Sequence, residues 1–414
     1  MLRNPGDHST DASWELYDVA CQVIPMGSQT HSKVPREELR GIEPCYLERG
    51  QGCRVWDVDG NEYIDFRAGL GPITLGYAYP AVVEAVKEQA EKGFVYSYAH
   101  PLEVTVAQDL VEIIPCAEEV RFLKTGGEAM SAVHRIARAH TKRDMILTCG
   151  YHGWLNVMDR AGVPDAIRSV YEAHPWGDAA AFEDALSRHE GNVAAISVAC
   201  DYAGIDQAET FLGDLRRLCD ANGCVLIYDE IVTGFRLRRG GAQELFGVIP
   251  DLAVFAKGMS NGVPLSCYAG KREIMETVRD VVISSTFGGD TLGLAAARAV
   301  IGVYQTEDVI GRLWDRGKQL HDGVGEIASR LDIEAGFEGY PPVGIFSFRS
   351  GDSPRDADNY SRLCGEMFKR GILLYTVCYP NYSHETEDID IALSAFDDAL
   401  TRMKAEGYFS GVSS

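Results

Sequence analysis

Short apolar runs alternate with amphipathic helical segments along the middle of this chain, and this alternation limits the folds it can adopt. The expected strands lie at 120–124, 144–149, 193–199, 224–229, 252–256 and 265–269, and the helices between most of them at 103–114, 127–141, 178–189 and 207–221. Strands that alternate with helices form a mainly parallel sheet covered on both faces. The sequence therefore predicts an α/β domain.

The flanking segments have a different character. Residues 52–66 alternate apolar and polar side chains around Asp59-Gly60-Asn61, which is typical of a β-hairpin. Beyond a long helical stretch at 290–331, we expect a smaller α+β unit with strands at 343–349 and 372–377 and helices at 355–369 and 386–406. The predicted organisation is an N-terminal segment at 1–65 that packs with the small domain, a large domain at 66–305 and the small domain at 306–414.

Charge and cysteine content narrow the class of protein. The chain has 414 residues and a formal net charge of −22, which argues against a general nucleic-acid or anionic-membrane surface. Its 11 cysteines include no CxxC pair and are interpreted as reduced thiols. The N-terminus lacks the apolar core of a signal peptide, and no run approaches the ~20 apolar residues that span a bilayer. We expect a cytoplasmic protein.

Two of the expected strands end in residues with reactive chemistry. Asp229 follows one apolar run, and Lys257 follows the run at 252–256. Because parallel strands present their carboxyl ends at one edge of a sheet, we expect both side chains to face the same cavity. A desolvated lysine can act as a nucleophile and then carry a proton, and a carboxylate can keep a pyridine nitrogen protonated. A pyridoxal phosphate enzyme requires this pair.

Each of these residues also has a simpler interpretation. Lys257 could be a surface lysine, although the apolar run before it and Gly258 after it favour a buried position. Asp229-Glu230 could belong to a salt-bridged loop or to the metal-binding acidic strand of a nucleotide hydrolase. Such hydrolases need a GxxxxGK[ST] phosphate loop, which this chain lacks.

Other segments could bind a phosphate or stack on a planar ring. The turn Thr125-Gly126-Gly127 lies between a strand and a helix, where free backbone N–H groups and the helix dipole favour an anion. Tyr151 follows the strand at 144–149 and could stack on a ring, although it could equally plug the domain edge. Thr286 lies in a glycine-rich stretch before an alanine-rich helix and could meet a phosphate or form part of a capping loop.

A competing motif is Gly258-Met259-Ser260-Asn261-Gly262, which matches the G-x-S-x-G nucleophile elbow of serine hydrolases. That elbow requires a helix directly after the serine. Here Val263-Pro264-Leu265 follows and predicts the start of a strand, so we interpret the match as accidental. The chain also shows no zinc-ligand spacing.

Taken in order, these segments resemble the class III aminotransferases of the fold-type I pyridoxal phosphate enzymes, and most of all the glutamate-1-semialdehyde aminomutase branch. The most specific part is VLIYDEIVTGFRLRRGGAQELFGVIPDLAVFAKGMSNGVPLSCYAGKREIM, and WDVDGNEYIDF, HPLEVTVAQDL, RFLKTGGEAMSAVHRIARAHTKRD, GYHGW and SHETEDID are also similar. The resemblance covers nearly the whole chain. It implies a large domain with a mainly parallel, seven-stranded type of sheet and a smaller α+β domain built from both termini.

The resemblance also implies roles for individual residues. Lys257 matches the Schiff-base lysine that holds pyridoxal 5'-phosphate, and Asp229 matches the partner of the pyridine nitrogen. Tyr151 matches the aromatic residue stacked on the ring, His152 follows it as in the family, and Ile231 matches the residue that packs on the other face.

The phosphate contacts follow from the same resemblance. Thr125, Gly126 and Gly127 match the phosphate-binding turn. Thr286 matches a phosphate ligand that the neighbouring subunit contributes, which implies a homodimer with shared active sites.

Several positions depart from the family pattern. The phosphate turn is usually Ser-Gly-Thr, so Gly127 removes one hydroxyl donor. Lys33 is the nearest counterpart of an arginine that binds the substrate carboxylate, and Lys and Arg are not equivalent in that task. Ala199-Cys200 replaces a Glu-Pro pair before a loop that looks shortened, and Trp154 replaces a histidine. These changes surround the phosphate and the substrate, so we infer retained chemistry and an altered substrate.

The resulting prediction is an aminotransferase that moves an amino group from an amino donor to a carbonyl acceptor, such as a sugar or a secondary-metabolite intermediate. The main alternative is an intramolecular aminomutase of the glutamate-1-semialdehyde type. A pyridoxal phosphate epimerase or decarboxylase, a serine hydrolase and a non-catalytic relative are the remaining alternatives.

Overall fold

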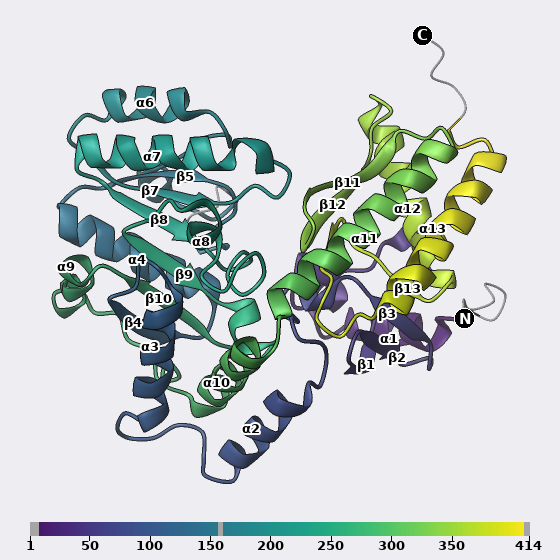
Figure 1. The fold of residues 1–414 in the computed structure, drawn as a ribbon, viewed down its shortest axis with the longest axis horizontal. Helices are drawn as coiled ribbons and strands as arrows, with labels where there is room; N and C mark the ends of the chain where they lie inside the picture. Colours follow the sequence, from purple (N-terminus) through teal and green to yellow (C-terminus); the bar gives the residue numbers. More distant parts are fainter. Residues whose placement is uncertain (1–7, 156–159, 410–414) are drawn as a thin grey trace. The chain divides into compact units, whose positions relative to one another are not determined.

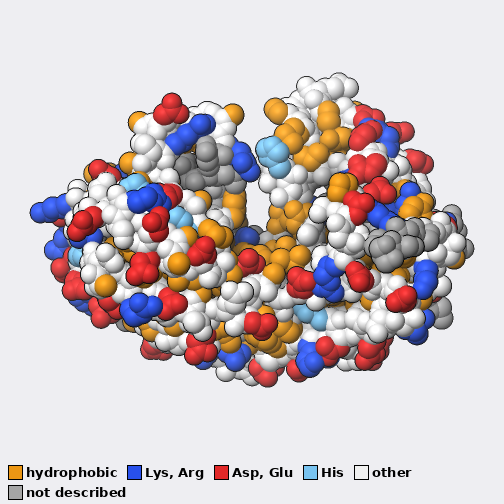
Figure 2. Space-filling view, turned by 90° about the horizontal axis from the view of Figure 1, so that it is seen from above, with side chains coloured by type: hydrophobic (Ala, Val, Ile, Leu, Met, Phe, Trp, Pro, Cys, Tyr) orange, Lys and Arg blue, Asp and Glu red, His pale blue; other side chains and the backbone are white. Residues whose placement is uncertain are grey.

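The computed structural model describes residues 8–155 and 160–409. The chain forms two compact units, which are described separately (Figure 1). The small unit combines Met1–Leu70, Thr74–Tyr79 and Gly311–Ser414, and the large unit combines Gly71–Ile73 and Pro80–Ile310. Acidic side chains are spread over the face seen in Figure 2, as expected from the net charge of −22.

The large unit contains a seven-stranded sheet in the order β4-β10-β9-β8-β7-β5-β6. Its strands are β4 (Glu119–Leu123), β5 (Met145–Cys149), β6 (Tyr171–Ala173), β7 (Val193–Ala199), β8 (Val225–Asp229), β9 (Leu252–Phe255) and β10 (Ser266–Gly270). Only β10 runs antiparallel to its two neighbours, and the other adjacent strands are parallel. The predicted mainly parallel sheet is confirmed.

Helices flank this sheet in the large unit (Figure 1). The longer ones are α2 (Pro80–Ala90), α3 (Pro101–Ile113), α4 (Gly126–Thr141), α6 (Ala179–Arg188), α7 (Ala208–Asn222) and α10 (Thr291–Thr306), and the short ones are α5 (Asp165–Arg168), α8 (Ala242–Phe246) and α9 (Arg272–Met275). The 3-10 helices are η6 (Ile205–Gln207), η7 (Lys257–Ser260) and η8 (Glu276–Arg279). Because Ala129, Val133 and Ile136 recur at helical spacing, α4 buries one apolar face in the core it shares with the sheet.

The small unit contains two small sheets, β1-β2-β3-β13 and β11-β12-β14. Its strands are β1 (Leu47–Gln51), β2 (Arg54–Asp57), β3 (Glu62–Asp65), β11 (Ala335–Tyr340), β12 (Val343–Phe348), β13 (Ile372–Leu373) and β14 (Val377–Cys378). Its helices are α1 (Asp11–Ala20), α11 (Val309–Arg330), α12 (Ser353–Lys369), α13 (Thr386–Ala405) and the 3-10 turns η2 (Pro25–Gly27), η3 (His31–Lys33), η4 (Glu37–Leu39) and η5 (Ala68–Leu70). Parallel pairing of β13 with β3 brings the two ends of the chain into one sheet.

The structure corrects several predicted elements. The single strand expected at 372–377 is two short strands, because β13 pairs with β3 whereas β14 pairs with β12 in the other sheet. The sequence missed β1, whose side chains are mostly exposed, and also β6 and β11. The predicted hairpin at 52–66 is confirmed as β2 and β3. Among residues 8–155 and 160–409, none of the helices has both the length and the apolar character of a membrane span.

Candidate active site

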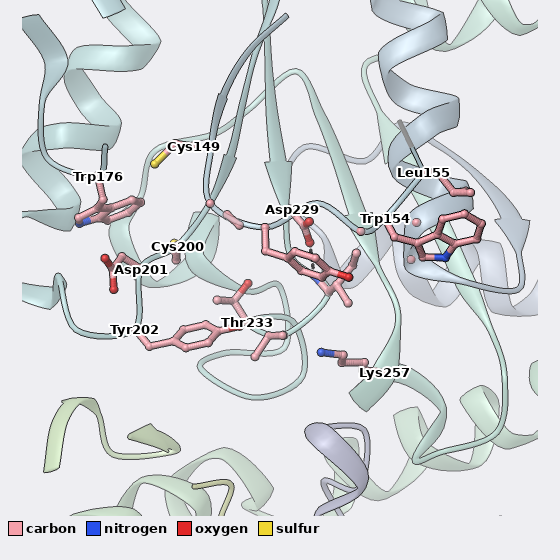
Figure 3. Close-up of a pocket in the computed structure, with 18 of the residues that line it drawn as sticks. Cys149, Trp154, Leu155, Trp176, Cys200, Asp201, Tyr202, Asp229, Thr233 and Lys257 are labelled. Carbon is pink, nitrogen blue, oxygen red and sulfur yellow. Dashed lines mark hydrogen bonds between the residues drawn. The ribbon is translucent and has the colours of Figure 1, made fainter. Parts of the chain in front are cut away.

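A cavity of about 600 Å³ opens at the carboxyl ends of the parallel strands in the large unit. Its lining includes Thr125, Gly126, Gly127, Tyr151, Asp229 and Lys257, which come from four separate segments, and Figure 3 labels Asp229 and Lys257 among them. A smaller cavity of about 210 Å³ shares Gly126, Ile231 and Lys257 with it. Open α/β sheets bind ligands at this edge, and the larger volume suits a small-molecule ligand.

Lys257 directly follows β9 and Ala256, and its side chain points into the cavity (Figure 3). Its backbone has a φ of 47°, the left-handed region that non-glycine residues rarely adopt and that is often found at functional sites. Burial lowers the pKa of Lys257 below its usual 10.5, although the charge of Asp229 partly opposes this effect. Nζ has no hydrogen bond or ion pair within residues 8–155 and 160–409. A neutral, unpaired amine is the nucleophilic form of lysine.

Lys124, a second lysine near the smaller cavity, is held differently. Its Nζ lies 2.9 Å from Asp290 Oδ2 and donates a hydrogen bond of 3.1 Å to the carbonyl of Pro264. An ion pair with a carboxylate favours the charged amine, which cannot attack a carbonyl. The surroundings therefore distinguish Lys257 from its neighbour.

Asp229 ends β8, which lies parallel to β9, so its carboxylate emerges at the same edge as Lys257. Its Oδ1 accepts a hydrogen bond of 3.1 Å from the backbone N–H of Ile231, and its Oδ2 lies 3.0 Å from His152 Nδ1. The other ring nitrogen of His152 lies 3.2 Å from the carbonyl of Ser197. His152 therefore links the carboxylate of Asp229 to the backbone of β7.

The sequence counted His152 among the cofactor contacts, whereas the structure buries its ring behind Asp229 and outside the cavity lining. Another buried histidine lies beside it, since the rings of His134 and His152 have centroids 6.2 Å apart. His134 Nε2 lies 3.0 Å from Ser197 Oγ, and its Nδ1 lies 3.4 Å from the hydroxyl of Tyr171. Burial, together with the nearby His152 and Arg138, lowers the pKa of His134 well below 6.5. A hydrogen-bonded polar cluster therefore supports Asp229 from inside the protein.

The N-terminus of α4 has the features of an anion site. The backbone N–H groups of Gly126 and Gly127 find no hydrogen-bond acceptor among the residues that the structure describes, and both glycines line the cavity. A Cβ on Gly126 would lie 2.5 Å from Ile231 Cδ1, so a larger residue there would displace the Ile231 side chain. The hydroxyl of Thr125 donates to Glu128 Oε2 over 3.1 Å and accepts from its backbone N–H over 3.4 Å as a helix cap. The free N–H groups and the helix dipole suit a phosphate.

The remaining predicted residues are placed as follows. Tyr151 and Trp154 line the cavity with 64% and 74% of their surfaces exposed, and Ile231 lines both cavities. Thr286 lies in the exposed loop before α10 and is not part of either lining. Lys33 ends η3 in the small unit.

At the other end of the cavity, the sequence had singled out only Cys200, together with Ala199; it did not identify the further lining residues Cys149, His174, Trp176, Asp201 and Tyr202. Asp201 and Tyr202 follow the predicted strand at 193–199, so the rule that led to Asp229 would also have found them. Trp176 follows β6, and the sequence did not predict this strand because its three residues form no apolar run.

The competing serine motif does not form an elbow. Ser260 ends η7, is 1% exposed and donates its hydroxyl to the carbonyl of Val263 over 2.5 Å. The next regular element is β10 rather than a helix. The match is therefore accidental, as predicted. Across the described ranges, the structure also contains no cluster of three or more residues that could hold a metal ion.

Comparisons with known proteins agree with this architecture. The family model "Aminotransferase class-III" matches residues 38–162 and 178–400. A glutamate-1-semialdehyde 2,1-aminomutase from Syntrophobacter fumaroxidans is 34% identical and aligns over 95% of this chain and 98% of its own length. A 3-aminobutyryl-CoA aminotransferase from Cloacimonas acidaminovorans is 31% identical, with 95% and 97% covered. The PLP internal aldimine form of the Sphingopyxis sp. MTA144 FumI protein superposes with a TM-score of 0.89 at 25% identity, over 95% of this chain and 97% of that one.

Proposed function

The chain belongs to the class III aminotransferases and is a pyridoxal 5'-phosphate enzyme, and from this premise we propose that it transfers an amino group between a small-molecule amine and a carbonyl compound at the cavity containing Lys257. The observation that carries this proposal is the unpaired amine of Lys257 beside the hydrogen-bonded carboxylate of Asp229 at one sheet edge. Transfer to a sugar or a secondary-metabolite intermediate is part of the proposal.

The residues of the cavity fit the cofactor. Gly126 and Gly127 would hold its phosphate at the start of α4, and Thr125 keeps that helix end in place. Tyr151 and Ile231 would contact the two faces of the ring. When bound, the cofactor would supply an electron sink that stabilises negative charge on the amine-bearing carbon.

Lys257 would have two tasks. Its Nζ would attach the cofactor covalently in the neutral form, which burial favours by lowering the pKa of Lys257. Once displaced by the substrate amine, Nζ would take a proton from the amine-bearing carbon and deliver it to the aldehyde-derived carbon of the cofactor, on the other side of the shared nitrogen.

Asp229 would keep the pyridine nitrogen protonated. It can do so because His152 and the N–H of Ile231 fix its carboxylate at the strand end. The charge of the carboxylate favours a proton on any nitrogen close to it.

An intramolecular aminomutase uses the same groups, and the relatives carry both names. The two functions differ in whether an external amine is needed. A transaminase consumes one equivalent of amine donor for each carbonyl aminated, whereas an aminomutase isomerises one molecule with no added donor.

The test is to record the visible spectrum of the purified, cofactor-loaded protein while amines and then carbonyl compounds are added. We expect the absorption band of the bound aldehyde form to disappear with an amine donor and to return with a carbonyl acceptor. A spectrum that no amine changes would contradict the proposed function.

We also propose a cytoplasmic homodimer in which Thr286 of one subunit contacts the phosphate held by the other. Its exposure in the loop before α10, outside the cavity of its own chain, supports a role toward a partner. Thr286→Ala would then weaken cofactor binding without changing the dimer mass measured by light scattering.

A further inference from the structure

The cavity extends along the sheet edge beyond the position proposed for the cofactor. Its far end follows β6 and β7, and Figure 3 shows Asp201 between Trp176 and Tyr202 there, with Lys257 pointing in from the other end. Both ends belong to the same cavity of about 600 Å³. A ligand that reacts at Lys257 can therefore extend a substituent toward Asp201.

The wall of this far end is held in place by a close contact. Trp176 Nε1 donates a hydrogen bond of 3.1 Å to the carbonyl of Gly204, and its indole ring lies edge-on to Phe211 at 4.8 Å between centroids. A Cβ on Gly204 would lie 2.2 Å from Trp176 Nε1, so glycine lets the loop that carries Asp201 lie against the indole. The position of the aromatic wall is therefore built into the fold.

The charges in the cavity are unequal at its two ends. Two of the described residues that line it are carboxylates. Asp229 is paired with His152, whereas Asp201 accepts a hydrogen bond of 2.9 Å from the N–H of Ala203, and no cation in the described ranges pairs with it. Burial lowers the pKa of His174, which also lines this end, below 6.5 and favours its neutral form, although the charge of Glu172 partly opposes this effect. Asp201 thus leaves one uncompensated negative charge.

The two cysteines at this end of the cavity do not change its charge. Burial, reinforced by the charge of Asp201, raises the pKa of Cys149 to about 12. Burial also raises the pKa of Cys200 well above its usual 9.0. Both remain neutral thiols, so the far end combines one carboxylate with aromatic faces and small apolar groups.

We propose that this far end is a subsite for a positively charged group of the substrate, an ammonium or a guanidinium, with Asp201 as its counter-ion and Trp176 and Tyr202 as its aromatic walls. Aromatic faces attract cations, and a carboxylate adds a charge-assisted hydrogen bond. The inference rests on the proposed transaminase function and narrows its substrates to basic amines and their carbonyl counterparts. A substrate carboxylate is repelled from this end.

The test compares amines of equal chain length that differ only at their far terminus. Wild-type holoenzyme is given α,ω-diamines from propane to hexane, the matching monoamines and the matching ω-amino acids, and the decay of the cofactor band gives kcat/KM for each. We expect the best diamine to exceed its monoamine about tenfold, with the amino acid lowest, because one such ion pair is worth roughly a factor of ten. In Asp201→Asn the diamine-to-monoamine ratio falls to near one.

The control variant is Asp206→Asn, which removes the same charge from the exposed loop outside the cavity and should keep the wild-type ratio. Calorimetric titration of cofactor-loaded Lys257→Ala gives a second readout without turnover, in which the diamine should bind about tenfold more tightly than the monoamine. Equal values for diamine and monoamine at every chain length, or a ratio unchanged by Asp201→Asn, would overturn the subsite. If no amine of any kind changes the cofactor band, the failure lies in the proposed function.

Discussion

The two ends of the cavity are built differently. At the reacting end, Lys257 and Asp229 extend from adjacent parallel strands, and a buried histidine fixes the carboxylate. At the far end, Asp201 and Trp176 lie on loops after β7 and β6, and the carboxylate has a single hydrogen-bond donor. Rigid strand ends suit a fixed chemistry, and loops suit a specificity that changes between relatives. Substitutions at the reacting end should therefore change activity toward all substrates, whereas substitutions at the far end should change the choice between substrates.

The largest loss of activity is expected from substitution of Asp229 at the reacting end. Asp229→Asn removes the charge that keeps the pyridine nitrogen protonated, so kcat/KM should fall by roughly 10² to 10³ for every amine. The loss should be the same for diamines and monoamines, unlike the effect of Asp201→Asn. A steady-state comparison on matched amines measures both, and a loss confined to diamines would remove the distinction between the ends.

A smaller effect is expected behind the reacting end. His152→Phe leaves Oδ2 of Asp229 without its hydrogen-bond partner and should lower kcat/KM about tenfold, the value of a hydrogen bond to a charged group. Ser197→Ala is the matched control, because it keeps the backbone carbonyl that accepts from His152 and removes only the hydroxyl next to His134. Equal losses in the two variants would show that the cluster matters for packing and not for the orientation of His152.

The smallest effect concerns stability in acid and should leave substrate choice unchanged. His134 has a folded-state pKa well below 6.5, so below this pH the unfolded chain takes up a proton that the folded protein does not. The free energy of unfolding must then decrease as the pH falls. His134→Gln removes this proton uptake, so the decrease in the free energy of unfolding between pH 7.5 and 5.5 should be smaller by about 1.4 kcal/mol.

Urea unfolding at the two pH values measures this difference. His321 provides a control in the small unit, because burial lowers its pKa to about 4. His321→Gln should reduce the acid sensitivity in the same direction without affecting the cofactor spectrum. An unchanged slope in His134→Gln would mean that this histidine is charged in the folded protein.

The difference between the two ends also explains what the sequence could predict. The apolar runs predicted β8 and β9 as buried strands. Because parallel strands present their carboxyl ends at one edge of a sheet, Asp229 and Lys257 were expected at the same edge, and the structure shows that the two strands are parallel neighbours. The turn at Thr125 was recognisable from its glycines, and the structure adds that the threonine hydroxyl caps α4. The domain boundaries after residues 65 and 305 and the roles of the site residues stay predictions.

Other features depend on tertiary contacts that no local pattern encodes. β6 has three residues, only one of them a strand former, and exists because it pairs with β5. The position of Trp176 depends on Gly204, which lies in another loop. His152 looked like a cofactor contact because it follows Tyr151, yet the chain turns it inward to Asp229. Loop and side-chain placement therefore required the folded structure.

The proposed chemistry requires that Lys257 Nζ carries the cofactor. The direct measurement is borohydride reduction of the purified holoenzyme, which fixes an imine-linked cofactor to its lysine, followed by proteolysis and mass spectrometry. We expect a pyridoxyl group on the peptide that contains Lys257, no label in Lys257→Ala, and unchanged labelling in Lys124→Ala. A label on Lys124 or any other lysine, or no label at all in a protein that holds the cofactor, would contradict it.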